Sequence, residues 1–171
     1  MSKIAGSQAE VTIRDFRRQY VPLISTVVAI LISILPIVST SLWSPNFGFL
    51  ILLTWRLLRP EIWEAWTALA LGLAADLIGG SVLGQSMLIW TLTFLALDYA
   101  DSWLGSRDYW FDWLLAAAAL TFHSVGVWYI ALLMGSEIGF PVMVPQLGLS
   151  ILAYPVAARL VLGLDRWRLM R

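Results

Sequence analysis

The sequence predicts an all-α protein, a polytopic membrane bundle of about six transmembrane helices, and two observations carry this prediction. Apolar residues make up 60% of the 171 positions and charged residues 13%, whereas soluble domains are close to half apolar and a quarter charged. The apolar residues also form six stretches, at about 22–38, 46–58, 62–79, 82–97, 110–134 and 141–164. No polar stretch is long enough for a second domain, so we expect one integral membrane domain over residues 1–171.

The first two stretches need separate arguments. The first, 22–38, follows a basic tail at 1–19, but its end, LPIVSTSLWSPN, lacks the small-residue cleavage site of a signal peptide, so we expect a retained span. The second, 46–58, is short against the roughly 20 residues that usually cross a bilayer. It is tilted in a thinned bilayer, shielded by its neighbours, or re-entrant. A re-entrant segment would leave both arginines of RLLR outside, which favours a full span.

The other four stretches are justified by their ends and lengths. Glu61 and Glu64 begin the third, where carboxylates favour the positive end of a helix and can pair with Arg56 or Arg59. The tight turn GGS joins the third stretch to the fourth. The fifth and sixth are long enough to cross a core of about 30 Å with some tilt. Three prolines can each begin a helix: Pro22, Pro45 and Pro141. Pro155 lies inside the sixth stretch and should kink it.

The basic residues set the orientation. If all six stretches cross and the N-terminus is cytoplasmic, every Lys and Arg falls in the N-terminal tail, the two inner connections or the C-terminal end. The outer connections STSLWSPN, GGSV and GSEIGF contain none, as the positive-inside rule predicts. Both termini, with tails at 1–19 and 165–171, should therefore be cytoplasmic. Most tryptophans lie near the ends of stretches, whereas Trp90 and Trp128 do not and should be buried or face another helix.

The sequence offers little reactive chemistry. Cysteine is absent, which excludes disulfides, thiolate zinc sites and cysteine nucleophiles. The single histidine, His123, has no carboxylate four residues away, so we expect a buried, hydrogen-bonded structural residue, with a proton relay or a partner contact as alternatives. No catalytic motif is present, and topology and lipid headgroups explain the short arginine clusters beside the spans. We therefore expect no catalysis, no cofactor, no metal and no nucleic acid.

The acidic residues lie mostly at the periphery. Four of them crowd the second inner connection with only Arg107 beside them: Asp98, Asp101, Asp108 and Asp112. That connection is either a docking surface for a basic partner or a solvated acidic loop.

One carboxylate, Asp76, stands inside an apolar, glycine-rich segment, GLAADLIGGSVLG. An ionised carboxylate is costly in a membrane and needs a reason. The tight turn places Asp76 beside the start of the next helix, around Ser81 to Leu83. Its oxygens can accept hydrogen bonds from the exposed N–H groups there and meet the positive end of the helix dipole. We expect a turn lock or interhelical clasp, with a partner or ligand contact and a proton carrier as alternatives.

The segment RPEIWEAWTALALGLAADLIGGSVLGQSMLIW resembles the core of a bacterial family, the rod shape-determining protein MreD. Members carry an arginine-proline pair, a glycine, an aspartate and then spaced glycines that end in a leucine-glycine step. The matching positions here are Arg59-Pro60, Gly72, Asp76, Gly80 and Leu83-Gly84, with Tyr99 at the end of the fourth stretch. The resemblance makes these residues candidates for structural or partner-interface roles.

The resemblance implies a non-catalytic subunit of the cell-elongation machinery in the bacterial inner membrane. Such proteins associate with MreC, a bitopic protein with a large periplasmic domain. They act with the actin-like MreB filament, a SEDS glycosyltransferase and a class B penicillin-binding transpeptidase. We therefore expect this chain to bind MreC, to contact membrane lipid, and to support peptidoglycan synthesis and rod cell shape.

The family is also similar in fold to the six-helix substrate-binding subunits of energy-coupling-factor vitamin transporters. This similarity leaves an alternative function, a subunit that binds a small, vitamin-like solute from outside. The alternative requires an outer-facing polar pocket lined by several spans. Few polar side chains are expected there: Asp76, Gln85, Ser86, Glu137 and Gln146.

Overall fold

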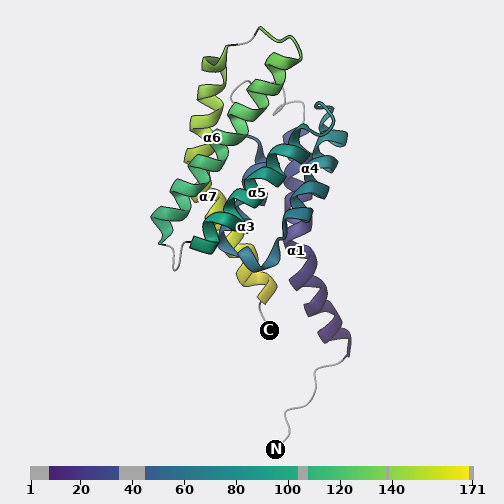
Figure 1. Cartoon of the computed structure of the whole chain (residues 1–171). Coiled ribbons are helices and arrows are strands. Elements are labelled where there is room, and N and C mark those ends of the chain that lie inside the picture. Colours follow the sequence, from purple (N-terminus) through teal and green to yellow (C-terminus); the bar gives the residue numbers. More distant parts are fainter. Residues whose placement is uncertain (1–7, 35–44, 104–107, 138, 170–171) are drawn as a thin grey trace, which may run out of the picture.

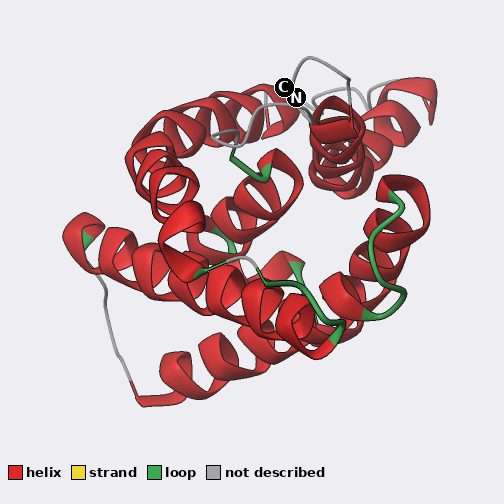
Figure 2. Ribbon diagram, turned by 90° about the horizontal axis from the view of Figure 1, so that it is seen from above, coloured by secondary structure: helices red, strands yellow, loops and turns green. Residues whose placement is uncertain are grey.

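The computed structural model describes residues 8–34, 45–103, 108–137 and 139–169, with side chains from Tyr20 onward. These residues form helices and connections and no strand (Figure 2). The helices are α1 (Gln8–Ile34), α3 (Phe47–Leu58), α4 (Ala65–Gly79), α5 (Gln85–Trp103), α6 (Tyr109–Leu133) and α7 (Val144–Leu169), with 3-10 turns at Pro60–Ile62 and Phe140–Met143. The all-α prediction is confirmed.

Each helix overlaps one predicted apolar stretch, but three helices are longer than predicted: α1, α5 and α7, the last of which continues to Leu169. Helix α1 begins at Gln8, so Pro22 lies inside a helix and the expectation that it begins one is wrong. The segment QAEVTIRDFRRQ before it contains no glycine or proline and several good helix formers, which explains the early start. Helix α5 continues to Trp103. Pro155 lies inside α7, and Pro141 lies in the first turn of a 3-10 helix.

The outer surface of the bundle is apolar. Helix α6 and the segment Phe140–Leu169 are long and apolar enough to cross a membrane, and shorter apolar helices lie at Tyr20–Ile34, Phe47–Leu58 and Ala65–Gly79. Large side chains such as Leu77, Leu114 and Leu152 are more than 60% exposed. This is the reverse of a soluble surface and fits contact with lipid.

Helix α3 is the buried centre of the bundle. Its 12 residues span only about 18 Å, less than a bilayer core. Almost every residue from Gly48 to Leu57 is nevertheless buried, and Phe49, Leu53 and Trp55 have no exposed surface. Helices α1, α6 and α7 pack against it. Of the three possibilities for this short stretch, its burial favours a helix shielded by its neighbours.

The two tryptophans placed away from helix ends face other elements, as expected. Trp90 of α5 is fully buried, and its ring lies 5.6 Å from the ring of Phe49. Trp128 of α6 is half-buried and lies edge-on to Phe140, with 5.5 Å between ring centroids. Both side chains therefore help to pack neighbouring elements together.

The bundle has two ends (Figure 1). Helix α1 begins and α7 ends at one of them, here called the terminal end. The α4–α5 turn around Gly80 to Gly84 and the α6–α7 connection lie at the other, here called the turn end. The start of α1 and the end of α7 on one side match the arrangement that the predicted orientation requires.

Candidate functional site

The turn between α4 and α5 depends on two glycines. Gly80 caps α4 with a φ of 68°, and its N–H donates to the carbonyl of Asp76 at 3.1 Å. Gly84 has a φ of 89°, and its carbonyl accepts the N–H of Leu88 at 2.9 Å. Both conformations lie in the left-handed region, where a side chain costs about 1–2 kcal/mol. Glycine at these two positions therefore permits the reversal of the chain.

A third glycine lets the two helices touch. A Cβ added at Gly72 would lie 2.6 Å from the Cα of Met87 and 2.9 Å from the carbonyl carbon of Ser86. Both are backbone atoms in the first turn of α5, so a side chain cannot be accommodated without moving that helix. The absence of a Cβ at Gly72 thus sets the close approach of α4 and α5.

Asp76 lies one helical turn after Gly72 on the same face of α4. It is 1% exposed, and its carboxylate accepts hydrogen bonds from the Ser81 hydroxyl at 2.8 Å, the Ser86 N–H at 3.0 Å and the Met87 N–H at 3.3 Å. The two amides belong to the first turn of α5, where N–H groups have no partner within the helix and the dipole is positive.

The geometry at Asp76 is that of an interhelical clasp. The helix begins at Gln85, later than the sequence indicated, so the bonded amides are those of Ser86 and Met87 and not those around Ser81 to Leu83. With its oxygens occupied and 1% of its surface exposed, the Asp76 carboxylate presents almost no surface to a partner.

Three further motif residues, Arg59, Pro60 and Tyr99, lie toward the terminal end. Arg59 caps the C-terminus of α3, and its Nε and Nη2 atoms donate to Asp165 at 3.0 and 2.7 Å. The hydrogen bonds to Asp165 raise the pKa of Arg59 above its ordinary value, although partial burial opposes them. Pro60 begins the 3-10 turn that follows. Tyr99 is 68% exposed on α5 and contacts Trp103, with 6.1 Å between ring centroids.

A second ion-pair cluster at the terminal end was not predicted. Arg56, 2% exposed, pairs with Asp98 and with Asp101, the latter at 2.9 Å. Asp98 and Asp101 lie in α5 and pair with Arg56, so the expectation that they belong to a solvated loop is wrong, whereas a docking surface for a basic partner stays a prediction. Arg168 belongs to the other ion-pair cluster, because it donates to Asp165, the partner of Arg59, at 2.7 Å.

These pairs do not follow from the sequence, because their members are far apart along the chain. Arg56 is 42 and 45 residues from its two partners, and Arg59 is 106 residues from Asp165. Only one of the suggested pairings occurs, between Arg59 and Glu61 at 3.6 Å. One signal was available: an arginine inside an apolar helix requires a counter-charge on another span.

Comparison with known proteins identifies the family. Residues 14–164 match the family described as rod shape-determining protein MreD. The chain belongs to the MreD family. MreD proteins are membrane components of the machinery that determines cell shape. No curated protein and no solved structure matches the chain, so the similarity in fold to transporter subunits stays a prediction.

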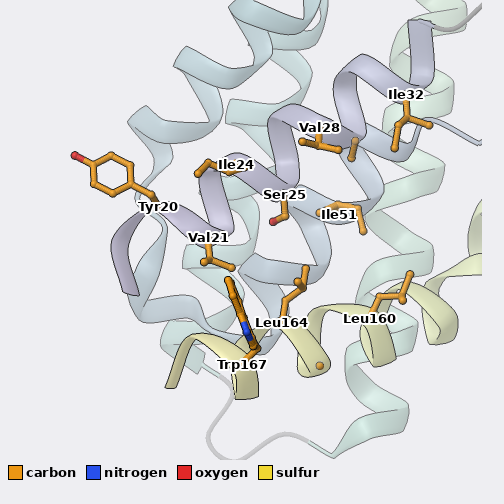
Figure 3. Close-up of a pocket in the computed structure, with 12 residues that line it drawn as sticks. Tyr20, Val21, Ile24, Ser25, Val28, Ile32, Ile51, Leu160, Leu164 and Trp167 are labelled. Carbon is orange, nitrogen blue, oxygen red and sulfur yellow. The ribbon is translucent and has the colours of Figure 1, made fainter. Parts of the chain in front are cut away.

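This MreD family member has an apolar groove of about 760 Å³ between α1 and α7 (Figure 3). Figure 3 shows Leu164 and Trp167 of α7 facing Val21 and Ser25 of α1. The Ser25 hydroxyl is occupied, because it donates to the Pro22 carbonyl and accepts from Trp55, both at 2.9 Å. The groove is lined by Tyr20, Val21, Ile24, Ser25, Val28, Ala29, Ile32, Ile51, Leu160, Gly163, Leu164 and Trp167.

A smaller, polar pocket of about 370 Å³ opens near the turn end of this MreD bundle. It is lined by Ile30, Ser33, Ile34, Asn46, Ala75, Gly79, Ser81, Gln85, Ser86, His123, Val127 and Gln146. His123 is buried, as expected, and its ring stacks on Phe49 at 4.4 Å. Its Nε2 atom has no hydrogen-bond partner among the described residues, which departs from the expected hydrogen-bonded histidine.

The described residues provide no basis for a metal centre. They contain no group of three or more His, Asp or Glu side chains that could hold an ion. The buried carboxylates instead face arginines or helix amides. Two cavities among the described residues are candidates for function, the groove between α1 and α7 and the polar pocket near the turn end.

Proposed function

We propose that this chain is a non-catalytic, multi-pass subunit of the bacterial elongation complex in the inner membrane, with both termini cytoplasmic. In this proposal it binds MreC and supports peptidoglycan synthesis and rod cell shape. The observation that carries the proposal is the family match over residues 14–164, nearly the whole chain. MreB, the SEDS glycosyltransferase and the class B penicillin-binding transpeptidase are reached through the complex, and membrane lipid surrounds the bundle.

The groove between α1 and α7 supports binding of a single transmembrane helix, which is what a bitopic partner such as MreC supplies. Its walls carry small residues at Ser25 and Ala29, four positions apart on α1, and at Gly163 on α7. Small residues allow helices to approach closely in a membrane, where close packing drives association. The stretch of α1 from Tyr20 to Ile32 gives a contact about 18 Å long. We assign this groove to the MreC transmembrane helix.

In the same proposal the family motif shapes the bundle. Gly72 and Asp76 fix α5 against α4, and Gly80 and Gly84 allow the turn between them. Arg59 joins the end of α3 to α7 through Asp165. These residues therefore act on partners through the positions of the helices.

In-cell photo-crosslinking tests the groove assignment. A photoreactive phenylalanine analogue is placed at Val28 or Leu160 in the groove, and at Leu95 or Leu114 as controls of similar exposure on α5 and α6. We expect an MreC adduct from the groove positions and none from the controls. Equal adducts from Leu95 or Leu114 would overturn the groove assignment, and failure of MreC to co-purify with the wild-type chain would overturn the proposed function itself.

The transport alternative gains one observation, the polar pocket near the turn end. Six helices or their flanks contribute to it, so it meets the part of the requirement that concerns several spans, and its outward orientation stays part of the alternative. Purification of the tagged chain in mild detergent separates the two functions. Recovery of an ATPase pair and a transmembrane coupling subunit would support transport, whereas recovery of MreC with wall-synthesis enzymes would support the elongation complex.

A further inference from the structure

The polar pocket near the turn end has the dimensions of a ligand site. Its volume of about 370 Å³ falls at the lower end of the range of roughly 300–1,000 Å³ that small-molecule pockets occupy. Residues from α1, α4, α5, α6 and α7 line it, together with Asn46 before α3. The site is therefore built by the fold as a whole and not by one loop.

The lining mixes polar and aliphatic side chains and contains no Asp, Glu, Lys or Arg. It offers the amides of Asn46, Gln85 and Gln146 and the hydroxyl of Ser33, with aliphatic surface from Val127 and its neighbours. The nearby Asp76 carboxylate is covered by Ser81 and Ser86, so a charged ligand would lose its hydration without contacting a counter-charge, and this lining selects against ions.

Several of these polar groups are unused within the protein. His123 is only 8% exposed, and its Nε2 atom has no hydrogen-bond partner in the described chain. The side-chain amides of Gln85 and Gln146 also make no hydrogen bond within the described residues. A buried polar atom without a partner is unfavourable, and a hydrogen-bonding molecule in the pocket would remove this cost.

The position of His123 sets the depth of the pocket. It lies ten residues before the end of α6 at Leu133, which corresponds to about 15 Å along the helix. Phe49 stacks on the imidazole ring and holds its plane. The pocket therefore extends from Ser81 and Gln85 near the turn end down to the imidazole.

We propose that this pocket binds a small, uncharged molecule that carries hydroxyl or amide groups, with Gln85 and Gln146 near its mouth and His123 at its floor. The aliphatic lining favours a compact molecule that also has an apolar face, as sugars do. This binding site does not depend on the groove between α1 and α7, and it adds ligand recognition to a subunit proposed to act as a scaffold.

The test uses the fact that His123 is the only histidine in the chain. The full-length protein, carrying an affinity tag without histidine, is labelled with [13C,15N]-histidine, placed in lipid nanodiscs and observed by NMR. Glycerol, acetamide and N-acetylglucosamine are titrated as uncharged probes, with glucosamine and glucuronate as charged analogues. We expect saturable shifts of the imidazole signals with uncharged probes and none with the charged ones.

A matched pair of variants separates pocket binding from a general effect. Gln146→Leu removes one lining amide and should weaken the apparent affinity by about tenfold. Thr121→Val removes a hydroxyl from the exposed face of α6, outside the pocket, and should leave the affinity unchanged. Absence of any saturable shift, or equal shifts in Gln146→Leu and wild type, would overturn the proposal. Neither result bears on whether MreC binds, because the titration uses the isolated chain.

Discussion

Replacing Gly72 with alanine tests whether close contact and the Asp76 clasp form one structural unit. The added Cβ would lie 2.6 Å from Met87 Cα, 2.7 Å from Met87 N and 2.9 Å from the Ser86 carbonyl carbon. No rotamer change relieves a clash with backbone, so α5 has to move by roughly 1 Å to reach ordinary contact distance. That movement lengthens the hydrogen bonds from the Ser86 and Met87 N–H groups to the Asp76 carboxylate, now 3.0 to 3.3 Å, beyond hydrogen-bond range.

The expected cost follows from these two effects. Overpacking a tight contact costs about 1–3 kcal/mol, and weakening a hydrogen bond to a charged group costs about 1.5–3 kcal/mol. When α5 moves away, the overpacking falls but the hydrogen bonds to Asp76 weaken, so the two costs do not add in full. We therefore expect Gly72→Ala to lower the free energy of unfolding by about 2–4 kcal/mol. Unfolding by SDS in mixed micelles measures this, with fluorescence from the ten tryptophans as the signal.

Gly79 supplies the matched control on the same helix. A Cβ at Gly79 would meet no atom within 4 Å, so Gly79→Ala should be neutral or stabilise by up to about 1 kcal/mol. A double-mutant cycle adds Asp76→Asn, and Gly72→Ala should cost less in that background because the clasp is already weakened. Equal destabilisation by Gly72→Ala and Gly79→Ala, or additive effects in the cycle, would refute the reasoning.

Three further predictions concern single contacts, each measured by the same unfolding assay. Asp76→Asn presents an NH₂ group toward helix amides and should cost about 1–3 kcal/mol; stability equal to wild type would exclude the clasp. Arg56→Gln should lower the free energy of unfolding by about 1–3 kcal/mol, less than the loss of a fully buried ion pair, because Asp98 is half exposed. Adding Asp98→Asn and Asp101→Asn should restore part of this free energy, because the two carboxylates are then no longer left without their arginine. Gly84→Ala should cost about 1–2 kcal/mol from backbone strain alone, because its surroundings are open; no cost would show that the turn relaxes.

The sequence predicted the helices well because hydrophobicity and helix-breaking residues are local signals. All six apolar stretches became helices, and Asp76 could be placed beside the next helix because only a short turn separates them. The start of α1 was missed because the prediction relied on apolar character. Apolar character indicates which residues contact the membrane, but it does not show where a helix begins. Gln8 to Gln19 can form a helix without being apolar.

The ion pairs at the terminal end could not be predicted, because they depend on which helices become neighbours. Arg56 meets Asp98 only because α3 and α5 lie together, and a single sequence carries no information about that pairing. The groove and the pocket were missed for the same reason. Their walls come from helices separated by more than 100 residues, such as Val28 with Leu160 and Ser33 with Gln146.

Helix α1 connects the two cavities. Val28, Ala29 and Ile32 line the apolar groove, while Ile30 and Ser33, on the adjacent face of the same two turns, line the polar pocket. A helix moves as a stiff unit over so short a length, so a ligand that displaces Ser33 also displaces the groove wall. Two binding events that place different demands on one element are thermodynamically linked, and the linkage is reciprocal. If the pocket binds a ligand and the groove a partner helix, as proposed above, these positions on α1 would link the two affinities, although each site can be occupied without the other.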